Sequence, residues 1–257
     1  MEKINLEQMN WSEVDEAVKN GYETIIIPGG SVEQHGPHLP EKTDTFVAIE
    51  VSKRLAKSLG KTLIAPPIRP GLSLHHLTFP GSLTLRPETF TAILNDYIET
   101  FVEHGFKNII MYSGHGGNFI TMDKVAKEAR EKYPGITIIN GINNHDMEVI
   151  FPDIERSENL VEGAIGMCHA DDFETSMLLK LHPDLVDMSV VEKGNTEPLT
   201  DEALDRLYAG GMAALTVNGV LGDPRFADAE RGERNINRMV YELERKVRQI
   251  MDFPWIV

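Results

Sequence analysis

Short apolar runs rich in β-branched residues alternate with longer segments of helical period along the first half of the chain. The apolar runs predict four strands, at residues 24–28, 62–65, 108–112 and 136–139. The segments between them predict three helices, at residues 44–59, from 87 to a glycine at 105, and from the turn after 113 to about 133. Because strands joined by crossover helices lie parallel, we expect an α/β fold with a mostly parallel sheet flanked by helices on both faces.

The second half of the chain shows a weaker pattern. It predicts helices at residues 172–181, 201–208 and 234–251. Residues 143–167 have no clean period, so we expect a loop or a flap over a site there. No repeat and no long polar linker marks a boundary, and we therefore expect residues 1–257 to form a single domain.

The composition is that of a globular protein with an acidic surface. The chain has 257 residues, 41% of them hydrophobic, and its 40 acidic and 25 basic residues give a formal net charge of -15. This charge repels phosphate backbones and anionic lipids, so neither nucleic acid nor a membrane is an expected partner. The single cysteine, Cys168, suits a reducing compartment, and no apolar run approaches the roughly 18 residues of a membrane span. We expect a cytoplasmic protein.

Titratable residues follow two of the predicted parallel strands. Glu33 and His35 come after the first strand, and His115 comes after the third. In an extended segment Glu33 and His35 project to the same side, about 6.6 Å apart along the chain. Ligands of open α/β sheets bind beyond the carboxyl ends of the strands, and a carboxylate beside an imidazole there can hold a divalent metal. Asp44, which opens the following predicted helix, either caps that helix or turns back toward the same site.

Each of these residues also has an ordinary structural interpretation. Glu33 alone would be a solvated charge, and His35 alone a hydrogen-bonded histidine. The glycines at 114, 116 and 117 either form a tight turn between strand and helix or cradle a phosphate at the start of the helix. The phosphate interpretation is weak, because the segment lacks the spacing of the known phosphate-binding loops.

A second group of titratable residues lies further along the chain. His169 stands five residues before Glu174, across the start of a predicted helix. His169 is a candidate acid or base, and Glu174 is a candidate further ligand. The alternative is that the acidic residues 171, 172 and 174 only favour the positive end of the helix. We expect no nucleophilic role for Cys168, because nothing near it in the sequence would favour the thiolate.

Taken together, four motifs resemble the creatininase family. They are residues 33–40 with 43–45, residues 79–85, residues 114–118 and residues 169–176. They stand in the order that the family has. The resemblance implies an α/β fold with a dinuclear metal centre, hydrolysis of a non-peptide carbon–nitrogen bond, and assembly into a homo-hexamer.

The resemblance also implies a ligand set. Carried over position by position, Glu33 and His115 would bind one metal ion, His35 would bind the other, and Asp44 would bridge both. Nitrogen and oxygen ligands without a thiolate suit Zn, Mn or Fe, so two divalent ions of one of these metals are the expected cofactors. Two such ions would share a water and lower its pKa toward 7.

This chain departs from creatininase itself at two places. Creatininase has a glutamate two residues after the histidine of the third motif, where this chain has Gly117, and Glu174 is the candidate for the missing ligand. Creatininase also places tryptophans around its substrate pocket, in the region before the residue that matches His169. Here the only tryptophans are Trp11 and Trp255, outside that region, which argues against creatinine as the substrate.

The implied function is hydrolysis of a small-molecule amide by a metal-activated water. In this reaction His169 would deliver a proton to the leaving nitrogen, and the N–H groups of Gly116 and Gly117 would stabilise the oxyanion. His76, in a loop after the second strand, is a further candidate for substrate binding. Candidate substrates are a cyclic amide, a formamide such as a formylamino-pyrimidine, and the tail of a modified peptide. Two other functions stay open: a metal-stabilised binding protein without turnover, and a phosphate-binding protein built on residues 114–118.

Overall fold

The fold is given by a computed structural model that describes residues 3–158, 160, 164–165, 169–198 and 200–251. Its centre is a parallel sheet of four strands, β1 (Thr24–Gly29), β2 (Thr62–Ile64), β3 (Asn108–Ser113) and β4 (Thr137–Asn140). The strands lie in the order β2-β1-β3-β4. The four predicted strands and their parallel pairing are therefore confirmed.

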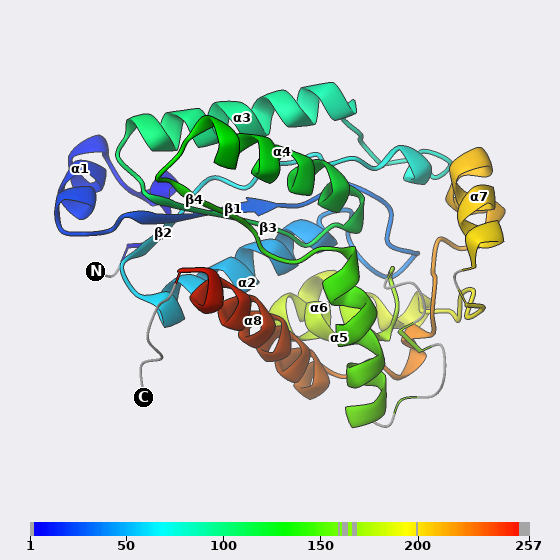
Figure 1. Cartoon of the computed structure of the whole chain (residues 1–257). Helices are drawn as coiled ribbons and strands as arrows, with labels where there is room; N and C mark the ends of the chain where they lie inside the picture. Colours follow the sequence, from blue (N-terminus) through cyan, green and yellow to red (C-terminus); the bar gives the residue numbers. More distant parts are fainter. Residues whose placement is uncertain (1–2, 159, 161–163, 166–168, 199, 252–257) are drawn as a thin grey trace.

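Helices cover both faces of this sheet (Figure 1). The described helices are α1 (Trp11–Lys19), α2 (Thr43–Leu59), α3 (Pro87–Glu103), α4 (Phe119–Lys132), α5 (Asn144–Ser157), α6 (Asp172–Leu181), α7 (Asp201–Gly210) and α8 (Ala229–Met251). In Figure 1, α3 and α4 lie on one face of the sheet, and α2, α6 and α8 lie on the other. This arrangement confirms the expected α/β fold.

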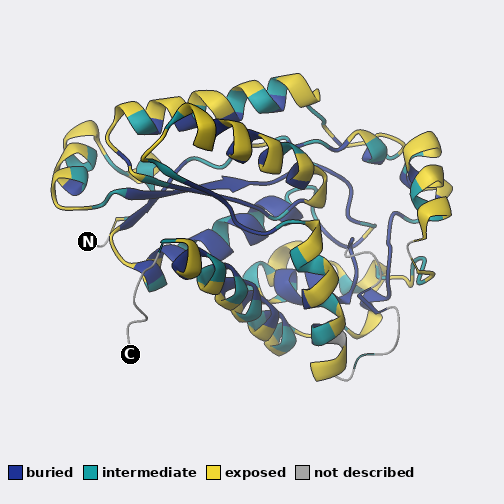
Figure 2. Cartoon of the chain, viewed as in Figure 1, coloured by how far each residue is buried: buried dark blue, intermediate teal, exposed yellow. Residues whose placement is uncertain are grey.

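Each face of the sheet packs against its own apolar core. Ile25 and Ile27 of β1 pack in the core formed with α3 and α4, whereas Ile26 packs in the core formed with α2 and α8. Successive side chains of a strand point to opposite faces, and here both faces are covered. The strands are consequently buried except at the first residues of β3 and β4, while the outer sides of the helices are exposed (Figure 2). The same burial explains why the strands appear in the sequence as continuous apolar runs.

The expected loop over residues 143–167 is wrong for most of its length, because Asn144–Ser157 form α5. The side chain of Asn143 accepts from the N–H of Asp146, and the Asp146 carboxylate accepts from the N–H of Asn143. This reciprocal cap starts the helix. Ile150 and Ile154 then pack into the core on the α8 side. Pro152 lies inside the helix and obscured its period in the sequence. Residues 159, 161–163 and 166–168 of that stretch lie outside the described residues.

Two further helices differ from the expectation. α8 begins at Ala229 and not at 234, because the polar, glycine-containing first turn gave no apolar signal. α1 was not expected, although Asn10 and Glu13 form a capping box at its start. None of the described helices is both long and apolar enough to cross a membrane.

The strand ends bring the predicted motifs together. Gly29 at the end of β1 pairs with Ser113 at the end of β3, so the segments that follow these strands start side by side. A Cβ atom at Gly114 would overlap the backbone oxygen of Asp44, so this glycine lets the first turn of α2 approach the end of β3. Three segments therefore meet at the carboxyl edge of the sheet.

Candidate metal centre

The structure brings the six candidate metal-binding and catalytic side chains into one buried cluster. The segment after β1 supplies Glu33 and His35, the first turn of α2 supplies Asp44, and the turn after β3 supplies His115. His169 and Glu174 come from the start of α6 and the residues before it. All six residues are at most 7% exposed. Such deep burial excludes the interpretation of Glu33 as a solvated surface charge.

Two groups of possible ligands share the Asp44 carboxylate. In the first group, His115 Nδ1 lies 3.1 Å from Asp44 Oδ2 and 3.2 Å from Glu33 Oε1. In the second, His35 Nε2 lies 2.9 Å from Asp44 Oδ1 and 3.6 Å from Glu174 Oε2. Within each group the ligand atoms lie within 4.8 Å of one another. The two oxygens of Asp44 therefore face the imidazoles of two different groups.

The outer nitrogens of these two histidines are engaged by backbone carbonyls. His35 Nδ1 lies 3.0 Å from the carbonyl oxygen of Glu33, and His115 Nε2 lies 3.1 Å from that of Leu72. Each outer nitrogen therefore carries the proton and donates it, so in the neutral ring the inner nitrogen has a free lone pair that faces carboxylate oxygens. In metal-binding histidines a carbonyl likewise holds the N–H of the ring and orients the other nitrogen toward the metal, and this donor set fits a divalent cation.

The electrostatics of the cluster also favour a divalent cation. Burial alone would lower the pKa of His35, but the carboxylates of Asp44 and Glu174 outweigh burial and raise it to about 10. Burial raises the pKa of Glu174 to about 8, against the opposing effect of His35. Burial acts to raise the pKa of Asp44 too, but His35 and His115 hold it well below its usual range. Three buried carboxylates thus compete for two imidazoles, and Glu33 Oε2 has no hydrogen-bond partner among the described residues. A divalent cation would take the place of the protons that these groups otherwise hold.

Local structure shows why Asp44 turns toward this cluster and does not cap α2. Lys42 occupies the cap position of α2 and makes no side-chain cap hydrogen bond. The Ser31 hydroxyl donates to Asp44 Oδ2 over 2.6 Å, and the Thr45 hydroxyl donates to the carbonyl of Ser31 over 2.9 Å. These bonds tie the first turn of α2 to the segment after β1, which decides between the two interpretations of Asp44.

At α6 the capping role belongs to a different carboxylate. Asp171 Oδ1 accepts from the N–H of Glu174 over 3.1 Å, which leaves the Glu174 side chain free to turn inward. The N–H of Ala170 donates to Glu174 Oε2 over 2.7 Å. Ala170 has a φ of 54°, an unusual conformation for a residue with a Cβ, and this orients its N–H toward the carboxylate.

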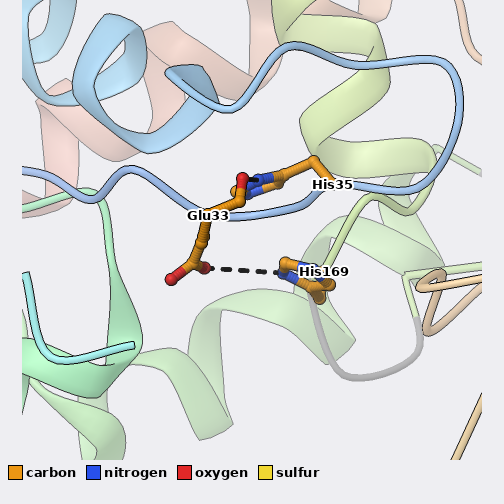
Figure 3. A group of neighbouring side chains, drawn as sticks. All are labelled: Glu33, His35 and His169. Carbon is orange, nitrogen blue, oxygen red and sulfur yellow. Dashed lines mark hydrogen bonds and ion pairs between the residues drawn. The ribbon is translucent and has the colours of Figure 1, made fainter. Parts of the chain in front are cut away.

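His169 belongs to the cluster but not to either group that shares Asp44. Its Nδ1 lies 3.9 Å from Glu33 Oε1, beyond hydrogen-bond distance (Figure 3). Glu33, His35 and His169 nevertheless form a third set of atoms close enough to share a cation. His76, the candidate for substrate binding, is also buried at the cluster, with its Nε2 3.4 Å from Glu33 Oε1.

The two glycines after His115 are exposed and begin a short 3-10 helix, Gly116–Asn118. A Cβ atom at Gly117 would lie 2.5 Å from both His115 Nε2 and the carbonyl oxygen of Leu72. A glutamate therefore does not fit at position 117 with this backbone, while Glu174 reaches His35 from another helix.

Two further residues of the cluster, Gln34 and His75, were not expected from the sequence. Gln34 is 5% exposed, and its side-chain nitrogen lies 2.8 Å from His169 Nε2. The ring of His75 stacks parallel to that of His115, with centroids 6.3 Å apart. Gln34 stands between two candidate ligands in the sequence, but no spacing rule signals where its amide would point.

Comparison with known proteins shows what the whole chain is similar to. The profile described as "Creatininase: Creatinine amidohydrolase" matches residues 7–247. The chain is 33% identical to the mycofactocin precursor peptide peptidase of Mycolicibacterium smegmatis, over 84% of this chain and 81% of that protein. It is 30% identical to the 3-dehydro-scyllo-inosose hydrolase of Thermotoga maritima, over 98% and 85% respectively. A solved structure of a creatininase mutant of Zn-Zn type superposes with a TM-score of 0.79 at 25% identity, covering 99% of this chain and all of that one.

Proposed function

This chain belongs to the creatininase family and is a hydrolase, and we propose that it uses two divalent metal ions to cleave a carbon–nitrogen bond of a small amide. The observation that carries the proposal is the position of Asp44. One oxygen of its carboxylate faces His35 and the other faces His115, each at hydrogen-bond distance. A carboxylate placed in this way is suited to bridge two cations.

We propose two ligand sets from the two groups. Glu33, Asp44 and His115 would hold one ion, and His35, Asp44 and Glu174 would hold the other. Zn, Mn and Fe are the candidate metals, because the ligands are nitrogen and oxygen without thiolate. When bound, such a pair of ions activates a shared water and polarises a carbonyl.

The remaining residues of the cluster have separate proposed roles. His169 is the proposed catalytic residue, because its Nδ1 faces Glu33 and it is not part of either set that shares Asp44. It would deliver a proton to the leaving nitrogen. His76 would contact the substrate from the adjacent 3-10 helix, Leu74–His76. Gly116 and Gly117 are exposed, and their N–H groups would stabilise the oxyanion that forms when water attacks the amide carbonyl.

The proposed substrate is a cyclic amide or a formamide of a small molecule other than creatinine. Trp11 is 82% exposed on α1, so it does not line the cluster, and no other tryptophan lies in the described part of the chain. A second candidate is cleavage at the tail of a modified peptide, which is favoured by the similarity to a precursor peptide peptidase. A homo-hexamer is the proposed assembly, and sedimentation of the purified protein measures it.

The decisive experiment is metal analysis of the purified protein and of two variants. We expect about two ions per chain in the wild type and a sharp fall in His115→Ala, since His115 belongs to the first ligand set. His145→Ala is the matched control, because His145 is exposed on α5 and forms an ion pair with Glu148, away from the cluster. If the wild type binds no Zn, Mn or Fe after reconstitution, the metal mechanism is wrong.

A substrate screen follows on the metal-loaded enzyme. Cyclic amides, formamides and short peptides are offered separately, and release of the amine or the new carboxylate is measured. Turnover of one class that disappears in His115→Ala would identify the substrate class. Full metal loading with binding but no turnover of any class would instead support a metal-stabilised binding protein.

A further inference from the structure

Gln34 lies between the candidate ligands Glu33 and His35, yet its side chain contacts neither of them. Its amide is buried, 5% exposed, and lies against two other histidines of the cluster. The amide nitrogen is 2.8 Å from His169 Nε2 and 3.2 Å from His76 Nδ1. One amide thus contacts the two rings to which we assign roles toward the substrate.

The direction of this amide is set by the backbone on either side of it. Gln34 Oε1 accepts from the N–H of Gly36 over 3.0 Å, and Gln34 Nε2 donates to the carbonyl of Gly219 over 3.3 Å. A reversed amide would place oxygen against oxygen at Gly219 and nitrogen against nitrogen at Gly36. Gly219 has a φ of 80°, and a Cβ atom there would overlap Gln34 Oε1. The glycine therefore leaves room for the amide, and the N–H of Gly36 and the carbonyl of Gly219 set its orientation.

The orientation of the amide decides which nitrogen of each ring carries the proton. An amide NH₂ group only donates, and its two hydrogens point to the two nearest acceptors, His169 Nε2 and His76 Nδ1, with the Gly219 carbonyl as the more distant third contact. In a neutral imidazole the proton then sits on the other nitrogen. That nitrogen is Nδ1 in His169, 3.9 Å from Glu33 Oε1, and Nε2 in His76, 3.4 Å from the same oxygen. Both rings consequently direct an N–H group toward the Glu33 side of the centre.

We propose that Gln34 is a positioning residue that fixes the tautomers of His169 and His76, so that both present an N–H donor to the substrate's carbonyl oxygen or leaving nitrogen. The inference rests on the proposed hydrolase function and changes one point of it: a neutral His169 gives the leaving nitrogen an N–H hydrogen bond, and the proton that this nitrogen takes up comes from the attacking water. A donor that is already oriented needs no reorganisation during the reaction, which is why preorganised N–H groups are effective in hydrolytic sites. A neutral imidazole held by its surroundings serves as such a donor in other enzymes.

The test separates this role from simple packing by means of two variants with opposite chemistry. Gln34→Glu keeps one oxygen for the N–H of Gly36 but places an acceptor against His169 Nε2. Gln34→Met fills a similar volume and removes both hydrogen-bonding groups. Gln249→Met is the matched control, because Gln249 lies on the exposed side of α8. Each protein is loaded with zinc, and its metal content and thermal unfolding are measured first.

The direct measurement is nitrogen-15 NMR of the histidine rings, with the His169 signals assigned by their absence in His169→Gln. We expect the wild type to show a protonated Nδ1 and an accepting Nε2 at His169. We expect Gln34→Glu to move the proton to Nε2, and Gln34→Met to leave a mixture of tautomers. A protonated Nε2 in the wild type, or the wild-type pattern in both variants, would overturn the proposal.

The kinetic measurement uses the substrate class found in the screen. We expect kcat of Gln34→Met to fall about 10²-fold to 10³-fold, as on loss of one oriented donor, with KM and metal content close to those of the wild type. A rise in KM with unchanged kcat would assign Gln34 to binding and contradict the proposal. If no substrate is turned over, the proposed function fails, while the NMR result still decides whether Gln34 sets the tautomer.

Discussion

Glu174 Oε2 lies 3.6 Å from His35 Nε2, so a carboxylate from α6 stands beside an imidazole from the segment after β1. The N–H of Ala170 holds the same oxygen from the other side, over 2.7 Å. This contact supplies a carboxylate that position 117 has no room for.

We predict that Glu174→Gln lowers the metal content from about two ions per chain to about one. The neutral amide is a poorer ligand, and it removes a carboxylate from only one of the two groups. Elemental mass spectrometry checks the stoichiometry. Glu230→Gln, an exposed carboxylate at the start of α8, is the control. Retention of both ions would mean that Glu174 is not a ligand.

Asp44→Ala should remove both ions at once, because its carboxylate faces both imidazoles. The variant also loses the bond from Ser31, so its folding is checked by circular dichroism before metal analysis. Asp15→Ala on α1 is the control, since Asp15 pairs only with Lys19 at the surface. A variant that keeps one full equivalent of metal would rule out the bridging role.

His169→Gln should keep both metal ions and lose turnover. If His169 acts on the substrate and not as a ligand, kcat falls by about 10²-fold to 10⁴-fold while metal content stays at the wild-type level. Steady-state kinetics and metal analysis are made on the same preparation. A parallel loss of metal would instead make the third group, with Glu33 and His35, a true binding site.

Acid should destabilise the protein partly through His38, which is buried with its Nε2 2.9 Å from the Thr175 hydroxyl. Burial, with a smaller effect from His35, lowers the pKa of His38 from 6.5 to about 4. As the pH falls through this window the unfolded chain takes up a proton that the folded chain does not, so stability is lost. The full loss is roughly 3 kcal/mol.

Denaturant unfolding at about pH 7 and about pH 4.5 measures this contribution in the wild type and in His38→Gln. We expect the wild type to lose roughly 2–3 kcal/mol more than the variant between the two pH values. Metal loss in acid affects both proteins and cancels in the difference. Equal losses would show that His38 titrates normally in the folded protein.

The close approach of α8 to α6 gives a prediction for the fold. A Cβ atom at Gly232 would overlap the backbone oxygen of Ser176, so Gly232→Ala must push the two helices apart. We expect a loss of about 1–3 kcal/mol in the free energy of unfolding, measured with denaturant. Glu230→Ala, on the exposed side of the same helix, should change it far less. An unchanged stability in Gly232→Ala would mean that the helices adjust freely.

Elements with a strong local signal were predictable. The apolar run from Thr24 predicted β1, and the regular spacing of Val47, Val51 and Leu55 predicted α2. α5 was missed because Pro152 suggests a break, although Ile150 and Ile154 pack into the core and hold the helix together. Tertiary packing there outweighs a local preference against helix.

Some residues of the candidate site were predictable from the sequence and others were not. Glu33, His35 and His115 were predictable, because residues at the carboxyl ends of adjacent parallel strands meet. Gln34 was not, since the direction of its amide depends on Gly219, far along the chain and in no motif.

By itself, the sequence determined the four strands, the helices between them, the parallel sheet, and the motifs at its carboxyl edge, because these depend on local periodicity and on strand direction. Only the tertiary structure decided that Asp44 turns toward the cluster and does not cap α2, and that Glu174 lies beside His35. It also decided that His169 is not part of the two groups that share Asp44. These relationships depend on side-chain direction and on contacts between segments distant in the chain. Burial and the contacts with neighbouring charges, which together shift the pKa values of these groups, exist only once those segments have packed.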